Sequence, residues 1–315
     1  MDQDMQVMMA RVAKLGEASE SEAKRIVDDV YKDGIVSRGE AEALFLINDT
    51  LEKADPFWGM RFSEAIKDFL LTREAPVGWV TQEEAQWLLG QINRSDDLAS
   101  HIEIDLILSI LRYAQGAPTD LSRFVLKSIS KHIVILGHAS SEMVERMRKA
   151  LYAPSGESGL WVNRYEAGVL FETNDAIAFA KNHPSWNDLF ARAIANHLLA
   201  RAHPEPETER EALAREAWLE DISSDTVGLI SSIVSSFGDK SWFSKVCFDP
   251  KKAEKARHVA NEIAMRKAED VTSDEEDWLM RRLGWDQKVS PAERALIDFL
   301  KTEAPGFAHG LAFAA

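Results

Sequence analysis

Residues 36–49 have the sequence VSRGEAEALFLIND, and residues 162–175 have the sequence VNRYEAGVLFETND. The two stretches share the pattern V-x-R-x-E-A-x-x-L-F-x-x-N-D. In the first stretch the apolar residues recur at spacings of three and four, which is typical of an amphipathic α-helix. We therefore expect a helix in this stretch and the same helix again in the second.

The similarity continues beyond these two stretches. Residues 56–66, PFWGMRFSEAI, share P-x-W-x-x-x-F-x-x-A-I with residues 184–194, PSWNDLFARAI, and residues 80–92, VTQEEAQWLLGQI, match residues 271–283, VTSDEEDWLMRRL. The offset between partners is 126 residues from 36 to 162, 128 from 56 to 184, and 191 from 80 to 271. This order indicates one unit duplicated in tandem, with an insertion in the second copy.

The sequence predicts an all-α protein of two homologous multi-helix units. We expect residues 1–120 to form the first unit, residues 121–151 to form connecting helices, and residues 152–315 to form the second unit, with a helical insertion at about residues 204–269. Alternating β-branched runs bounded by hairpin turns, the signal for strands, do not stand out in the sequence.

Length and composition set the class of protein. The chain has 315 residues, enough for about two domains, and 37 basic against 52 acidic residues give a net charge of −15, which argues against a large nucleic-acid footprint. The N-terminal residues lack the features of a signal peptide, and the apolar runs are far shorter than the ~20 residues that span a membrane. With one cysteine, Cys247, we expect a cytoplasmic protein with no membrane insertion.

Several helix starts carry a capping-box pattern, in which a polar residue precedes a glutamate by three positions. In a capping box the two side chains bond to each other's backbone N–H groups at the first turn of a helix. We therefore expect most of these glutamates to be structural. The pairs are Ser37 and Glu40, Thr81 and Glu84, Asn163 and Glu166, Thr272 and Glu275, and Ser290 and Glu293.

The segment before the first of these helices partly matches a calcium-binding loop. Asp29 falls at position 1, Asp33 at position 5 and Glu40 at position 12. Tyr31 replaces the oxygen ligand expected at position 3, and the equivalent residues 155–166 of the second copy offer fewer oxygen donors. Three interpretations stay open: an authentic EF-hand, a weak Ca²⁺ or Zn²⁺ site at Asp29, Asp33 and Glu40, or an Asp-Gly turn ahead of a capped helix, which we favour.

Residues 32–44, KDGIVSRGEAEAL, resemble the D-G-x-[VI]-S-x-x-E-x-x-x-[LI] segment of the tellurite-resistance TerB-like domains. The resemblance covers residues 26–113 and, less well, residues 160–199 and 271–300. It implies a non-enzymatic, acidic, helical module of the bacterial cytoplasm, connected with metal or stress response and with protein assemblies. The cation-facing residues that it implies are Asp33 and Glu40. The second copy lacks the Asp-Gly pair, and the insertion lies outside the family pattern.

Asn48 lies four residues after Leu44 and thus on the apolar face of its helix. It is either a buried amide bonded to a neighbouring helix or part of a polar pocket. The candidate pockets combine Glu40 with Asn48 and Asp49 in one copy, and Glu166 with Asn174 and Asp175 in the other. We interpret Trp58 and Trp186 as core anchors at helix starts rather than as ligand platforms.

No nucleotide-binding loop, nucleophile elbow or metalloprotease motif occurs in the sequence. The leading hypothesis is a protein-binding scaffold whose partner is another protein, contacted through aromatic residues of the insertion. A cation-binding regulatory module and an enzyme with paired carboxylates between the units are the alternatives, and a divalent cation is the one cofactor considered. The partner-binding candidates are Phe237, Trp242, Phe243 and Phe248.

Overall fold

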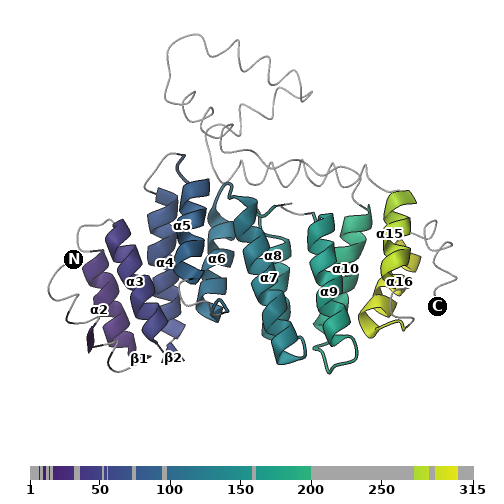
Figure 1. Ribbon diagram of the computed structural model, residues 1–315, viewed down its shortest axis with the longest axis horizontal. Helices are drawn as coiled ribbons and strands as arrows, with labels where there is room; N and C mark the ends of the chain where they lie inside the picture. The colour runs from purple at the N-terminus through teal and green to yellow at the C-terminus, as the bar shows by residue number, and fades with distance from the viewer. Residues whose placement is uncertain are drawn as a thin grey trace, which may run out of the picture. The chain divides into compact units, whose positions relative to one another are not determined.

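The computed structural model describes residues 17–31, 36–51, 53–54, 56–72, 76–93, 98–157, 161–199, 273–283 and 288–303, together with residues 7, 10, 11 and 14. These ranges contain 11 helices and one pair of two-residue strands (Figure 1). The predicted all-α class is therefore confirmed. The expected insertion, residues 204–269, lies outside the described residues, as do Asp33 and the partner-binding candidates Phe237, Trp242, Phe243 and Phe248.

The chain divides into two compact units. Unit 1 comprises residues 1–159 and 181–183, and unit 2 comprises residues 160–180 and 184–315. Residues 121–151, which we expected to connect the units, fall within unit 1. There the two helices that they form pack against each other and against the helix before them.

Unit 1 contains seven helices in its described part. Helix α4 packs against α2, α3 and α6, while α7 packs against α5, α6 and α8. Trp58, Phe62 and Ile66 on α4 are fully buried and form the centre of its core. The elements are β1 (Glu17–Ala18), α2 (Glu20–Val30), α3 (Arg38–Thr50), β2 (Lys53–Ala54), α4 (Pro56–Thr72), α5 (Gln82–Ile92), α6 (His101–Tyr113), α7 (Thr119–Leu136) and α8 (Ser141–Leu151), with β1 and β2 paired in parallel.

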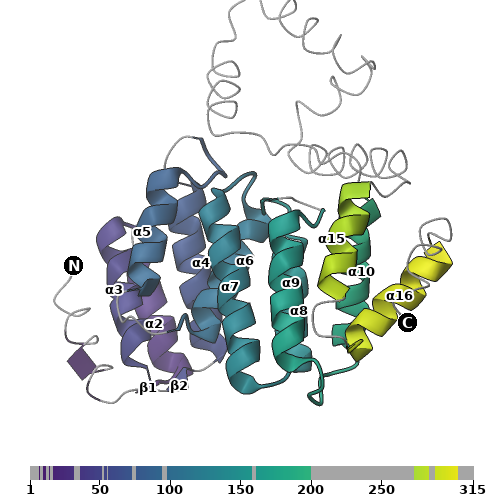
Figure 2. The same cartoon turned by 45° about the vertical axis from the view of Figure 1, so that its right-hand side comes forward.

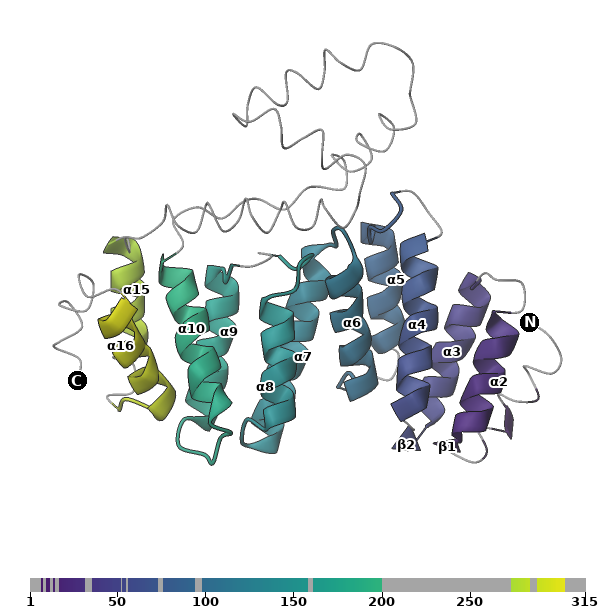
Figure 3. The same cartoon turned by 180° about the vertical axis from the view of Figure 1, so that it is seen from behind.

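Unit 2 contains four helices in its described part: α9 (Arg164–Ile177), α10 (Ser185–Leu199), α15 (Ser273–Leu283) and α16 (Pro291–Glu303). Helix α10 packs against both α9 and α16 (Figures 2 and 3). Trp186, Phe190 and Leu198 on α10 are fully buried. Trp58 and Trp186 are thus core anchors, as predicted.

Capping boxes begin several of these helices. At α3, Ser37 N donates to Glu40 Oε2 over 2.8 Å, and Glu40 N donates to Ser37 Oγ over 3.3 Å. Four predicted capping boxes are confirmed, and the predicted box at Thr272 lies outside the described residues. The confirmed pairs are Ser37 and Glu40, Thr81 and Glu84, Asn163 and Glu166, and Ser290 and Glu293.

Among the described helices, none combines the length and the apolar composition that crossing a membrane would require.

Candidate functional site

The two asparagines of the repeated pattern are buried and bonded to the two tryptophans. Trp58 Nε1 donates to Asn48 Oδ1 over 3.2 Å, and Trp186 Nε1 donates to Asn174 Oδ1 over the same distance. Asn174 Nδ2 also donates to Ser290 Oγ over 3.0 Å. Buried polar groups require such partners, so each amide is explained by the core around it.

The structure does not bring the members of the candidate polar pockets together. Glu40 bonds to Ser37 at the start of α3, and eight residues of helix, about 12 Å along the axis, separate it from Asn48. Glu166 bonds in the same way to Asn163, while Asp49 and Asp175 are exposed. The geometry therefore favours the interpretation of Asn48 and Asn174 as core amides.

The residues of the calcium-like loop are partly described. Tyr31 Oη donates to Asp68 Oδ2 over 2.6 Å, and burial together with this bond raises the pKa of Tyr31. The Glu40 carboxylate accepts from Ser37 at the helix start, a role that requires no cation. Within the described residues, no group of three or more His, Cys, Asp or Glu side chains lies close enough to hold a metal ion. The cation site at Asp29, Asp33 and Glu40 stays a prediction.

An edge-to-face aromatic cluster occurs at matching positions of the two units. In unit 1, Phe45 contacts Phe62 and Trp87, with ring centroids 5.0 and 5.9 Å apart. Such pairs add about 0.5–1.5 kcal/mol beyond the area they bury. In unit 2 the corresponding pairs are Phe171 with Phe190 at 5.0 Å and Phe171 with Trp278 at 5.5 Å.

An arginine guanidinium lies over the tryptophan ring of each cluster. The Arg38 guanidinium is 5.7 Å from the Trp87 ring centroid, and that of Arg164 is 5.9 Å from the Trp278 ring. These arginines occupy the shared third position of the repeated stretch. The sequence pattern therefore includes a residue that contacts another helix, and Arg38 also pairs with Glu42 on its own helix.

The C-terminal end of α7 exposes three successive apolar side chains. Ile133 is fully buried, whereas Val134, Ile135 and Leu136 are 45%, 75% and 52% exposed. Successive helical residues point about 100° apart, so four apolar residues in a row cannot all face one core. Gly137, with φ of 76°, ends the helix in the left-handed conformation that glycine adopts without strain.

A pocket of about 310 Å³ lies beside this exposed end. Ser140 caps the next helix, where Met143 N donates to Ser140 Oγ over 3.3 Å. We refer to the pocket, together with Val134, as the α7 corner. The residues that line the pocket are His101, His132, Ile135, Leu136, Ser140, Glu142 and Met143.

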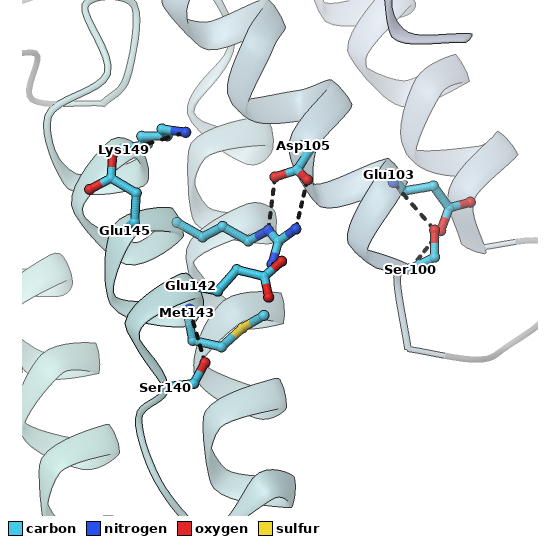
Figure 4. A network of polar contacts seen from close by, with 9 residues as sticks. Ser100, Glu103, Asp105, Ser140, Glu142, Met143, Glu145 and Lys149 are labelled. Atoms are coloured by element: carbon cyan, nitrogen blue, oxygen red, sulfur yellow. Dashed lines mark hydrogen bonds and ion pairs between the residues drawn. The ribbon is translucent and has the colours of Figure 1, made fainter. Parts of the chain in front are cut away.

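An ion-pair network adjoins the α7 corner through Glu142, which lines the pocket, whereas Arg146 and Asp105 do not line it. Arg146 donates to Asp105 through two nitrogens, at 2.8 and 2.7 Å, and to Glu142 Oε1 at 2.6 Å. Its side chain is 9% exposed, against 48% for Asp105 and 65% for Glu142. Figure 4 shows Asp105 and Glu142 converging from α6 and α8, with Ser140 and Met143 close to Glu142. Solvent therefore reaches the carboxylates of this network more readily than the guanidinium.

Two histidines form one wall of the pocket. The rings of His101 and His132 meet edge to face, with centroids 5.0 Å apart. His132 Nε2 lies 2.8 Å from Ala99 O, and because a carbonyl only accepts, this nitrogen carries the proton. Burial lowers the pKa of His101, as do the charges of Arg146 and His132. The lowered pKa favours the neutral form of His101.

The histidine and the two carboxylates on the first two turns of α6 have different partners. His101 contacts His132, Glu103 caps its own helix through Ser100, and Asp105 binds Arg146. The α7 corner was not predicted from the sequence. The available signal was the apolar run of residues 133–136 placed directly before a glycine.

No protein-family model, curated protein or solved structure matches the chain.

Proposed function

We propose that this chain is a non-enzymatic protein-binding module and that the α7 corner of unit 1 is its docking surface. The observation that carries the proposal is the exposed run Val134, Ile135 and Leu136 beside a pocket. Isolated exposed apolar residues are common, but a contiguous group next to a concave surface is typical of interaction sites. A partner that covers this surface gains roughly 25 cal/mol of binding free energy for each Å² of apolar surface that it removes from water.

The ion-pair network beside the corner supports binding rather than catalysis. Its two carboxylates, Asp105 and Glu142, share the Arg146 guanidinium. This arrangement is typical of a structural ion-pair network, whereas general acid–base catalysis requires a group that can exchange its proton near neutral pH. The remaining lining residues supply apolar surface and hydrogen-bonding groups of the kind found at interfaces.

We also infer that the two units derive from one duplicated ancestor. Four kinds of contact recur at the offsets of the sequence repeat: the capping box, the asparagine–tryptophan bond, the edge-to-face phenylalanine pair and the arginine over tryptophan. Helices α7 and α8 lie outside the matching blocks. On this inference the docking surface was added to the repeated unit rather than inherited with it.

A TerB-like origin stays part of the proposal and rests on residues 32–44. The same segment supports a cation-responsive module as the second candidate function. Its test is calorimetric titration of the chain with Ca²⁺ and with Zn²⁺. Release or uptake of heat that disappears on replacing Asp29 would favour this candidate over the protein-binding one.

Photo-crosslinking in the native cell tests the docking surface. A benzoylphenylalanine placed at Ile135 should give discrete crosslinked products. The same residue placed at Leu46 is the matched control, because Leu46 is also an exposed apolar residue on a helix of unit 1. We expect no discrete product from Leu46. Equal products from both positions, or none from Ile135, would contradict the assignment.

A further inference from the structure

We propose that the partner of the α7 corner is a basic amphipathic segment, in which a bulky apolar side chain enters the pocket and a neighbouring lysine or arginine binds the carboxylates of Glu142 and Asp105. This inference rests on the proposed function and specifies the chemistry of the partner. Size, charge and accessibility at the corner each support it.

The size of the pocket suits a side chain. Its volume of about 310 Å³ lies at the lower end of the ~300–1,000 Å³ typical of ligand pockets. Ile135, Leu136 and Met143 supply its apolar surface. An apolar side chain inserted there would cover Ile135 and Leu136, which are otherwise exposed to water.

The accessible charge of the adjoining ion-pair network is negative. Two carboxylates and one guanidinium leave the network with one net negative charge, and the guanidinium is the buried member. Among the described residues, only Arg146 bonds to Glu142, and it does so through Oε1. Oε2 of Glu142 is therefore available to accept a charge-assisted hydrogen bond from an incoming cation.

Among the residues that line the pocket, Glu142 is the one acidic residue, and none is a lysine or an arginine. The lowered pKa of His101 favours its neutral form. Lys131, one turn before Ile135 on α7, does not line the pocket. At longer range the net charge of −15 attracts basic partners to the chain as a whole.

The test uses three synthetic peptides of about 14 residues, a length that is marginal as a free helix and becomes ordered on binding. One alternates leucine and lysine in a helical pattern, one replaces the lysines by glutamates, and one replaces the leucines by serines. Calorimetry with the full chain should detect the Leu–Lys peptide and should give affinities at least about tenfold lower for the other two, a difference of about 1.4 kcal/mol.

Variants of the chain separate the local site from general attraction. E142Q should lower the affinity for the Leu–Lys peptide about three- to tenfold, and I135S should lower it about tenfold or more. E145Q is the matched control, because Glu145 lies on the same helix and is also ion-paired, to Arg148, but does not line the pocket. It should change the affinity by less than about twofold.

Other results would contradict either the basic partner or the local site. Equal losses in E142Q and E145Q would show that attraction is to the whole acidic chain, and the inference would fail. Binding of the Leu–Glu peptide that depends on Ile135 would refute the basic partner and leave the docking surface intact. Failure of all three peptides to bind would also refute the basic partner, and crosslinking from Ile135 would then decide the docking surface independently.

Discussion

The indole Nε1 of Trp186 donates to Oδ1 of Asn174 over 3.2 Å in the buried centre of unit 2. Trp58 and Asn48 form the same bond at the same distance in unit 1. In both units the bond joins the helix that carries the repeated stretch to the helix that follows it. A buried donor pays a desolvation cost unless it finds such a partner, so this bond constrains how the two helices pack.

Replacing Asn174 by alanine should destabilise the protein. The change leaves Trp186 Nε1 buried without its acceptor, which costs about 1–3 kcal/mol. Urea unfolding followed by tryptophan fluorescence measures the loss. Asn48→Ala should lower the stability less, because Asn48 is 9% exposed against 1% for Asn174. Glu172→Ala, on the exposed face of the same helix as Asn174, should stay within about 0.5 kcal/mol of the parent.

The capping box at Ser37 and Glu40 predicts that two substitutions have unequal effects on stability. Ser37→Ala removes the acceptor for Glu40 N and should cost about 0.5–2 kcal/mol. Glu40→Gln should change the stability little, since glutamine also serves at the third position of a capping box. Thermal unfolding of both variants tests this contrast.

The same two variants test the alternative cation site. If Ca²⁺ or Zn²⁺ raises the melting temperature of the parent chain and Glu40→Gln abolishes that rise, the carboxylate binds a cation and the capping interpretation is incomplete. If the cations leave the melting temperature unchanged, the capping box is sufficient to explain Glu40.

Arg146 predicts a further contrast on α8. Arg146→Lys replaces a planar fork that bonds to Asp105 through two nitrogens, and the single ammonium group cannot reproduce this geometry, at a cost of about 1–2 kcal/mol. Arg148→Lys is the matched control, because Arg148 forms an exposed ion pair with Glu145 on the same helix. Its cost should be below about 1 kcal/mol. Urea unfolding measures both losses of stability. Similar losses for the two variants would contradict the conclusion that burial makes the Arg146 ion pair more important for stability than that of Arg148.

The histidine wall predicts a loss of stability in acid. Burial, Arg146 and His132 lower the pKa of His101 in the folded chain, whereas in the unfolded chain the pKa is about 6.5. Below that value the unfolded chain binds a proton that the folded chain resists. The contribution is thus fully present above pH ~6.5 and is lost as the pH falls through the lowered folded value.

His101→Gln removes this titration. The variant should lose less stability than the parent between neutral pH and pH ~5.5, a window set by the unfolded histidine. Thermal unfolding at a series of pH values measures the difference. An identical decline in both proteins would show that His101 does not contribute to it.

Features that depend on neighbours along the chain were predictable. The helix starts at Ser37, Thr81, Asn163 and Ser290 were correct because a capping box involves residues three positions apart. The burial of Trp58 and Trp186 confirms their interpretation as core anchors, since large aromatic side chains at helix starts bury much apolar surface.

Features that depend on contacts between distant residues were not predictable in the same way. Arg146 and Asp105 are 41 positions apart, and nothing in either helix alone indicates their pairing. Residues 121–151 were expected to connect the two units, and the structure assigns them to unit 1. Periodicity marks which face of a helix is buried but not which helix covers it.

The amino-acid sequence by itself determined the helical class, the helix starts and the internal similarity, because these depend on side chains within a few turns of one another. Only the tertiary structure showed that the exposed end of α7 lies beside His101, Glu142 and Met143. The physical reason is that the position and angle at which helices pack depend on the sum of many interhelical contacts. No single stretch of sequence contains that information.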